Sequence, residues 1–129
     1  MTFAKTLAAL ALALTSLAVP ALASAADPTG TWQTTSGESR YAVSYCGDGT
    51  QLCAKLTWLR DDARTPENLA LLGDYVVQGA QPTGANQWQG RVSYDGDTYT
   101  GRVTMVSEDA MKLSGCQGIF CKSLQFERL

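Results

Sequence analysis

Carboxylates and cysteines are the side chains of this chain that could carry out chemistry, because the sequence contains no histidine. Without histidine, neither a Ser-His-Asp nor a Cys-His nucleophile can form, and histidine metal sites are excluded. Ser39 lies in Gly37–Tyr41 (GESRY), which is not the Gly-x-Ser-x-Gly turn of hydrolases, and no serine has the Ser-x-x-Lys spacing. The sequence therefore contains no recognisable catalytic nucleophile.

Three pairs of carboxylates lie close together in the sequence and could serve acid–base catalysis or bind a cation. They are Asp61 with Asp62, Asp95 with Asp97, and Glu108 with Asp109. Neighbouring residues of a strand point to opposite faces, and Asp-Gly-Asp is typical of a hairpin turn. We therefore expect solvated turns, no metal, no cofactor and no enzyme activity. The alternative is an enzyme that uses these carboxylates with the loop Arg60–Gly73.

The cysteines fall into two close pairs along the chain. They are Cys46, Cys53, Cys116 and Cys121. Four cysteines allow three pairings, and we expect two local disulfides, because the first pair flanks Gly47–Gly49 and the second flanks Gln117-Gly118, both turn signals. The alternative is a four-thiolate metal site, which the gaps of six and four residues disfavour.

The N-terminus has the pattern of a secretory leader. Lys5 precedes the apolar run Leu7–Val19, and Ala23–Ala25 supplies small residues for cleavage near Ala25. The run is shorter than the roughly 18–20 residues of a membrane-spanning helix. We expect a signal peptide helix over residues 1–25 and a single domain over 26–129. The exported chain would lack a transmembrane segment and would be periplasmic or secreted, where disulfides persist.

The charge of the chain argues against nucleic acid as a partner. The formal net charge is −2, and the basic residues form no cluster. Nucleic-acid binding requires concentrated Lys and Arg, so this class of partner is excluded.

Strands must position these side chains, because apolar and polar residues alternate with a period of two from Thr31 onward. In Gln87–Tyr94, for example, Trp88 and Val92 share one face. The following Asp95-Gly96 predicts a hairpin. The predicted strands are Thr31–Thr35, Arg40–Cys46, Leu52–Leu59, Asp74–Gln78, Gln87–Tyr94, Thr98–Ser107, Ala110–Cys116 and Cys121–Arg128.

One stretch, Arg60–Gly73, breaks this alternation, and we expect Leu69–Leu72 to form a single helical turn that closes one barrel end. Eight antiparallel strands in about 100 residues avoid exposed edges most simply by closing on themselves. The expected fold is all-β, a small eight-stranded antiparallel up-and-down barrel. A two-sheet sandwich is the alternative.

Aromatic residues at alternating positions raise the question of what the barrel contains. An eight-stranded barrel is just wide enough to be filled by side chains or to hold one small ligand. Both interpretations stay open. If the mouth binds a small apolar or amphipathic molecule, its candidate lining is Tyr41, Tyr45, Trp58, Trp88, Tyr94 and Met105.

Two short motifs resemble the lipocalin-like, or calycin, barrels. Gly30–Trp32 (GTW) opens the first predicted strand, and Phe126–Arg128 (FER) ends the last one. The resemblance implies that Trp32 plugs one barrel end and that Arg128 lies across its ring, a cation–π contact that seals the barrel.

A longer series of motifs resembles the bacterial exported family called domain of unknown function 2147 (DUF2147). The motifs are Gly30-x-Trp32, Gly37-x-Ser39-Arg40, Cys46, Leu52-Cys53, Leu56-x-Trp58-Leu59, Leu71-Leu72-Gly73, Trp88-x-Gly90, Asp95-Gly96-x-x-Tyr99 and Leu113-x-Gly115-Cys116. They span nearly the whole exported part. This resemblance implies a lipocalin-like barrel and export, and it implies no reaction.

The segment Ser36–Tyr41 is similar to the Ser-Gly and Tyr loop of small periplasmic lysozyme-inhibitor barrels. That similarity favours a second function, in which loops or the outer face dock on an envelope protein. The expected partner is thus a small apolar molecule in the mouth or, alternatively, an exported protein.

Overall fold

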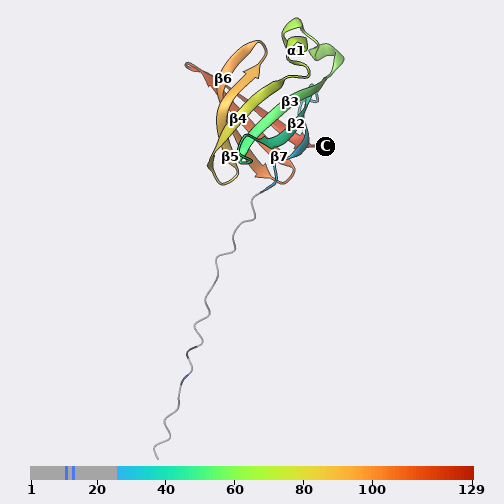
Figure 1. The fold of residues 1–129 in the computed structure, drawn as a ribbon. Coiled ribbons are helices and arrows are strands. Elements are labelled where there is room, and N and C mark those ends of the chain that lie inside the picture. Colours follow the sequence, from blue (N-terminus) through green and yellow to red (C-terminus); the bar gives the residue numbers. More distant parts are fainter. Residues whose placement is uncertain (1–10, 12, 14–25) are drawn as a thin grey trace, which may run out of the picture.

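The alternating pattern of the sequence becomes eight consecutive antiparallel strands that close into a barrel (Figure 1). The strands are β1 (Gly30–Thr34), β2 (Ser39–Cys46), β3 (Gln51–Leu59), β4 (Tyr75–Gly84), β5 (Gln87–Tyr94), β6 (Asp97–Ser107), β7 (Ala110–Gln117) and β8 (Phe120–Arg128). Each strand pairs with the next one along the chain, and β8 pairs with β1. The up-and-down barrel is confirmed, and the sandwich alternative is wrong.

The structure is a computed structural model, and it describes residues 11, 13 and 26–129. Apart from Ala11 and Ala13, the predicted signal peptide over residues 1–25 lies outside the described residues. Within the described part, no helix has the length and apolar character needed to cross a membrane.

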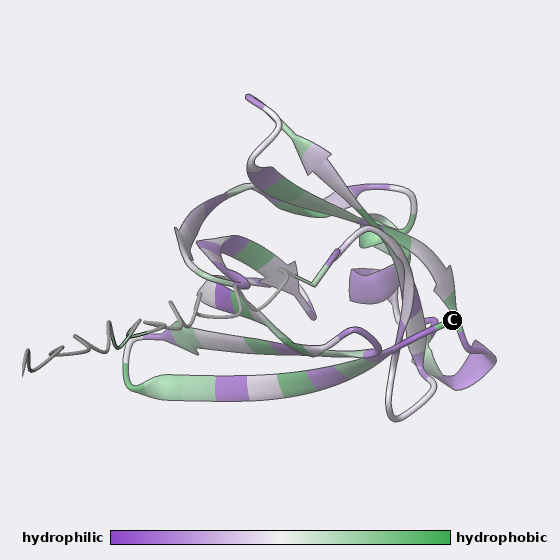
Figure 2. Cartoon of the chain, turned by 90° about the horizontal axis from the view of Figure 1, so that it is seen from below, coloured by the Kyte–Doolittle hydropathy of each residue, from purple (hydrophilic) through white to green (hydrophobic). Residues whose placement is uncertain are grey.

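The core of the barrel is built largely by alternate residues of the strands, most regularly in β6. In β6, Tyr99, Val103 and Met105 are buried, whereas Thr100 and Arg102 between them are exposed. Figure 2 shows the resulting alternation of hydrophobic and hydrophilic residues along the strands. The period of two therefore separates an apolar interior from a polar outer face.

Three glycines lie side by side on neighbouring strands and leave no room for a side chain. Gly90 pairs with Gly101, which pairs in turn with Gly115. A Cβ atom on Gly101 would lie 2.4 Å from Cγ2 of Val92, and one on Gly90 would lie 2.9 Å from Cα of Ala80. The absence of side chains in this row lets atoms of the neighbouring strands approach the glycine backbone closely.

Strand β4 is longer than the sequence pattern predicts, since it runs from Tyr75 to Gly84 instead of ending at Gln78. Gly79 has a φ of 65°, and the register with β5 shifts on both sides of Gln81 and Pro82. These irregularities break the alternation of apolar and polar residues, but the pairing of β4 with β5 continues beyond them. The predicted strand therefore ended too early.

The connection between β3 and β4 contains a 3-10 helix η1 (Asp61–Ala63) and the helix α1 (Pro66–Leu71). The helix begins earlier than predicted, because the Thr65 side chain accepts a hydrogen bond from the Asn68 N–H and Pro66 occupies the first turn. Ala63 is buried, and Leu71 and Leu72 pack against the core. The segment therefore covers one barrel end, as expected, although not with the predicted turn.

The glycine row predicts that alanine destabilises the barrel at Gly101 and has little effect at Gly84, outside the row. We expect Gly101→Ala to lower the free energy of unfolding by about 1–3 kcal/mol, the usual cost of overpacking. Gly84→Ala is the control, because a Cβ atom there would meet only the Gln87 side chain at 3.8 Å. Urea unfolding measures both. Equal stability of the two variants would contradict the close approach of the strands.

Candidate functional site

One end of the barrel is sealed by Trp32, the residue that the sequence predicts to plug it. Trp32 is 0% exposed, and its indole N–H donates to the Pro28 carbonyl at 2.9 Å. Arg128 pairs with Trp32 across the β1–β8 contact, and its guanidinium carbon lies 4.4 Å from the centroid of the indole ring. The structure thus places the two predicted barrel-closing residues in direct contact.

The guanidinium of Arg128 also ties together the segments around this end. It donates to the carbonyls of Thr29 and Asp27, which precede β1, and to the carbonyl of Glu108 at 2.8 Å, in the β6–β7 turn. With these bonds the end at the start of β1 is closed by side chains and backbone together.

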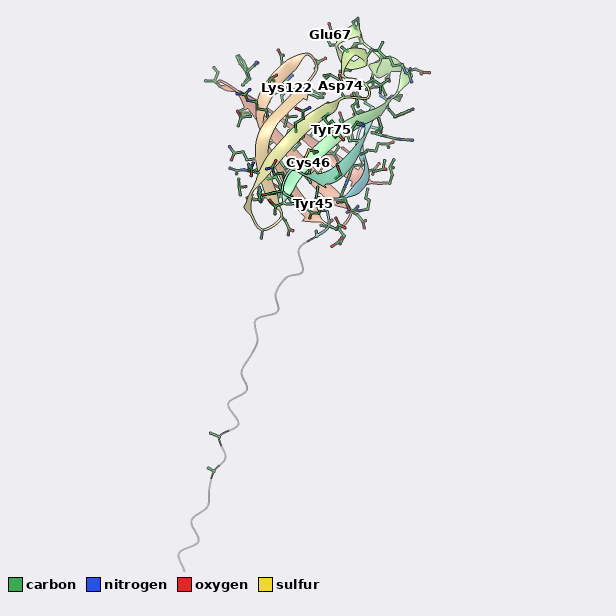
Figure 3. The ribbon with its side chains drawn as sticks, in the orientation of Figure 1. Tyr45, Cys46, Glu67, Asp74, Tyr75 and Lys122 are labelled. Carbon is green, nitrogen blue, oxygen red and sulfur yellow. A yellow bond between two sulfur atoms is a disulfide. The ribbon has the colours of Figure 1, made fainter. Side chains whose placement is uncertain are left out.

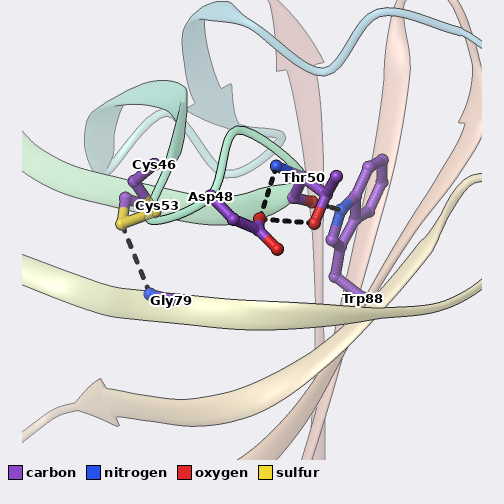
Figure 4. Close-up of a disulfide and its surroundings, with 6 residues drawn as sticks. All are labelled: Cys46, Asp48, Thr50, Cys53, Gly79 and Trp88. Carbon is purple, nitrogen blue, oxygen red and sulfur yellow. Dashed lines mark hydrogen bonds between the residues drawn. A yellow bond between two sulfur atoms is a disulfide. The ribbon is translucent and has the colours of Figure 1, made fainter.

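The cysteines form the two local disulfides that the sequence predicts, Cys46–Cys53 and Cys116–Cys121. Every thiol is therefore bonded, and the four-thiolate metal alternative is wrong. Figure 4 shows the first disulfide, where the Gly79 N–H donates to Sγ of Cys53 at 3.3 Å. The same turn is held to the barrel wall, because the Trp88 indole N–H donates to the Thr50 carbonyl at 3.1 Å.

The interior contains a small apolar cavity, which we call the inner chamber. It has a volume of about 40 Å³. It is lined by Trp32, Tyr41, Val43, Leu52, Ala54, Val76, Val77, Val92, Ser93, Tyr94, Val103, Met111, Leu113, Leu124 and Phe126. Pockets for drug-sized ligands measure roughly 300–1,000 Å³, so side chains fill most of this barrel.

A second cavity of about 40 Å³ lies at the α1 end, and we call it the mouth. Its lining is Thr34, Ser36, Glu38, Ser39, Tyr41, Leu56, Leu59, Ala63, Asn68, Leu71, Val76, Ser93, Tyr94, Asp95 and Leu124. The two cavities adjoin, because they share the wall residues Tyr41, Val76, Ser93, Tyr94 and Leu124. An apolar chamber therefore lies next to a polar mouth.

Hydroxyl groups organise the floor of the mouth. The Thr34 hydroxyl accepts the N–H groups of Glu38 at 3.1 Å and Ser39 at 3.2 Å. The Ser39 hydroxyl donates to the phenol oxygen of Tyr41 at 3.1 Å. Both Thr34 and Ser39 are buried, so this hydrogen-bonded turn is a fixed part of the wall.

The two phenols at the boundary between the cavities hold their protons more tightly than free tyrosine. Burial raises the pKa of Tyr41 above its usual value of 10.0, and the hydrogen bond with Ser39 opposes part of that rise. Burial also raises the pKa of Tyr94, and the negative charges of Glu38 and Asp95 raise it further. Both side chains are therefore neutral hydrogen-bonding groups at neutral pH.

The structure brings together two of the six predicted ligand-lining residues, since Tyr41 and Tyr94 border both cavities. Trp88 and Met105 are buried in the core but border neither cavity. Tyr45 has the strand parity of Tyr41, but it lies at the far end of β2 and is 45% exposed. Figure 3 shows Tyr45 at the barrel end opposite α1, away from the mouth.

Trp58 does not face the interior. This corrects its prediction as a residue that lines the interior. Strict alternation from Leu56 would place it inside, but the register shifts here, so that Leu56 pairs with Tyr41 while Trp58 pairs with Arg40. The extra residue, Thr57, reverses the faces, as a bulge does. Trp58 consequently stacks with the Arg40 guanidinium at 4.4 Å, outside the two cavities.

The predicted carboxylate pairs lie in turns and loops. Asp62 bonds Arg60 at 2.6 Å between Oδ1 and Nε, and Asp61 is fully exposed. The other pairs occupy or flank the β5–β6 and β6–β7 turns. Among the residues that the structure describes, no group of three or more His, Cys, Asp or Glu side chains could hold a metal ion.

Some residues of the mouth were missed by the sequence analysis. Glu38, Ser93 and Leu124 come from different strands and turns, and their convergence depends on register. The alternation of Leu124 with the buried Phe126 in β8 is a signal that could have identified one of them.

A comparison with family models agrees with the barrel boundaries. The model described as "Uncharacterized protein conserved in bacteria (DUF2147)" matches residues 30–128, from the first residue of β1 to the last residue of β8. No curated protein and no solved structure matches the chain.

The raised pKa of Tyr41 predicts a loss of stability in alkaline solution. The unfolded tyrosine loses its proton near 10.0 while the folded one keeps it, so this contribution is complete below that pH and is lost as pH rises through the folded pKa. We expect Tyr41→Phe to reduce the alkaline fall in the free energy of unfolding, measured by urea titrations from pH 8 upward. Superimposable profiles of the variant and the wild type would contradict the buried position of this phenol.

Proposed function

Since this chain belongs to the DUF2147 family of bacterial proteins, whose description names no activity, we propose its function from the barrel itself. We propose an exported, non-catalytic protein that binds a small amphipathic molecule at the α1 end. The supporting observation is the apolar inner chamber that adjoins a polar mouth. A ligand with one apolar and one polar end would place its apolar end in the inner chamber and its polar end in the mouth.

The volumes limit the size of the ligand. A single water needs roughly 10–15 Å³ of such space, so a chamber of about 40 Å³ admits a short alkyl group and excludes a long fatty chain. Burial of each methylene in an apolar site contributes about 0.8 kcal/mol. A short chain therefore supports only weak binding unless Tyr94, which borders both cavities, moves aside to enlarge them.

The disulfides support the exported location. Two disulfides are compatible with a protein outside the cytoplasm, because thiols are kept reduced inside most bacterial cells. We propose the periplasm or the external medium as the place of function, in agreement with the leader pattern of residues 1–25.

Filling the inner chamber should abolish binding. Ala54 lines the chamber, whereas Ala42 is exposed on the neighbouring strand β2. With n-hexanol as the probe, we expect NMR shift changes at Tyr41, Val76 and Tyr94 in the wild type. We expect binding about tenfold weaker, or none, in Ala54→Leu, because its side chain occupies the chamber. Ala42→Leu is the control and should bind like the wild type.

The outcome that contradicts the proposed function is equal binding by both leucine variants, or an absence of shifts in the wild type. An absence would mean that the chamber is inaccessible. Equal binding would place the alcohol elsewhere on the surface.

A second candidate function, docking on an exported protein, is favoured by the β7–β8 turn. Ile119 is 91% exposed and Phe120 is 72% exposed. The Cys116–Cys121 disulfide joins the two strands directly below them. Exposed large apolar groups on a constrained hairpin are typical of an interaction anchor.

The charges around this end indicate the kind of partner. In an up-and-down barrel the β7–β8 turn lies at the same end as the β5–β6 turn and α1. Asp95, Glu67 and Asp74 lie there together with Lys122 (Figure 3), and Gly96 of the β5–β6 turn lies next to the Glu67 side chain. We therefore propose a basic exported protein with an apolar pocket as the partner in this alternative.

A lysozyme provides a direct test of the docking alternative. We expect the wild type to inhibit the enzyme and the double variant Ile119→Ser/Phe120→Ser to lose most of that inhibition. Val106→Ser is the control, because Val106 is 66% exposed but lies at the end of β6 away from the β7–β8 turn. A wild-type protein that leaves lysozyme fully active, or a double variant that still inhibits, argues against this alternative.

A further inference from the structure

We propose that the polar end of the ligand is a cation: an ammonium group held in the mouth between the carboxylates of Glu38 and Asp95, with a short apolar chain in the inner chamber. This inference rests on the proposed function and gives the ligand its chemical class, a small amphipathic amine.

The first step of the argument is the charge of the mouth. Glu38 and Asp95 are its two carboxylates, and no lysine or arginine is among the residues that line it. The remaining polar groups of the wall are hydroxyls and one amide, such as Ser36, Tyr94 and Asn68. The lining therefore combines negative charge with neutral hydrogen-bonding groups, which is the composition that recognises an ammonium group.

The second step is that both carboxylates belong to fixed turns. The N–H of Glu38 donates to the Thr34 hydroxyl at 3.1 Å, and its carbonyl accepts the N–H of Arg60 at 2.8 Å. Asp95 begins the tight β5–β6 turn with a φ of 49°. A cation entering the mouth therefore meets carboxylates that extend from backbone positions already in place, so only the side chains must be ordered on binding.

The third step is that the neighbouring cations neutralise the carboxylates of the mouth only in part. Arg60 bonds Asp62 at 2.6 Å and lies 3.9 Å from Glu38, so its principal partner lies outside the mouth. Asp95 forms no ion pair with any residue in the described part of the chain. Glu38 is thus partly paired, whereas Asp95 forms no ion pair but lies close enough to Lys122 for its charge to raise the pKa of that lysine.

The fourth step is that the field of these carboxylates reaches the boundary with the inner chamber. Tyr94 borders both cavities, and in addition to burial the charges of Glu38 and Asp95 each raise the pKa of its phenol by more than the positive charge of Lys122 lowers it. A negative potential that disfavours a phenolate at this point favours a cation there by the same interaction.

Lys122 offers an alternative site, which would bind an anionic ligand instead of an amine. Its ammonium lies 5.7 Å from the ring centroid of Tyr94 and 5.6 Å from that of Tyr99, beside a third cavity of about 20 Å³. Figure 3 shows Lys122 at the same barrel end as Glu67 and Asp74. An anionic ligand would use Lys122 and this smaller cavity instead of the mouth, and the experiment distinguishes the two arrangements.

The experiment compares three probes of matched chain length on the purified protein: n-hexylamine, n-hexanol and hexanoate. Dissociation constants are measured by NMR titration at neutral pH and low salt. We expect n-hexylamine to bind about tenfold more tightly than n-hexanol, the effect of one favourable charge interaction in a partly exposed site, and hexanoate to bind most weakly. Added salt should reduce the difference in affinity between n-hexylamine and n-hexanol, because salt screens the charge interaction.

The double variant Glu38→Gln/Asp95→Asn should bind n-hexylamine and n-hexanol equally. Asparagine tolerates the positive φ at position 95, so the turn is retained. Asp97→Asn is the matched control, because Asp97 lies two residues further along the same turn and does not line the mouth. This control should keep the preference for the amine.

Two outcomes overturn the inference while the proposed function stands. In one, all three probes bind with equal affinity. In the other, hexanoate binds most tightly and Lys122→Met abolishes that binding. Absence of binding by every probe overturns the inference and the proposed function together.

Discussion

The closure of the barrel through the short contact between β1 and β8 is the constraint on which the rest of the structure depends. Trp32 pairs with Arg128, Gln33 with Glu127 and Thr34 with Phe126. Main-chain bonds across so few residues are reinforced by the contact of Arg128 with the Trp32 ring. Because this contact also seals one end, the inner chamber is closed there and adjoins the mouth at the α1 end.

The small number of strands explains why the interior is almost filled, because an eight-stranded barrel is just wide enough for side chains to fill it. At the glycine row Gly90–Gly101–Gly115, neighbouring side chains and backbone occupy the space that a Cβ atom would need. Large side chains from the other strands then meet near the axis, and Tyr41 contacts Phe126 with their ring centroids 5.5 Å apart. The volume left over is the inner chamber, the mouth and the third cavity of about 20 Å³, so the packing that stabilises the barrel leaves room for no more than a small molecule.

Local sequence patterns predicted the elements well, because the alternation of residue types and the turn residues act within a few positions. The eight strands, the Asp95-Gly96 turn and both disulfides are of this kind. Trp58 shows where such reasoning ends, since one bulge between paired strands reverses its face. Glu38 and Asp95 meet in the mouth from separate turns, and that convergence depends on the register of the whole barrel. The volume of the cavities likewise depends on how side chains pack, and the alternation of residues along a strand does not determine it.

The inner chamber is the centre of this account, and xenon tests it most directly, because the gas binds in apolar cavities with little effect on their walls. The measurement is the anomalous diffraction of crystals of the protein held under xenon pressure. The account predicts a xenon atom in the inner chamber between Val43, Val103 and Phe126, in a volume of about 40 Å³. A chamber without xenon, whose wall side chains touch one another, would contradict it.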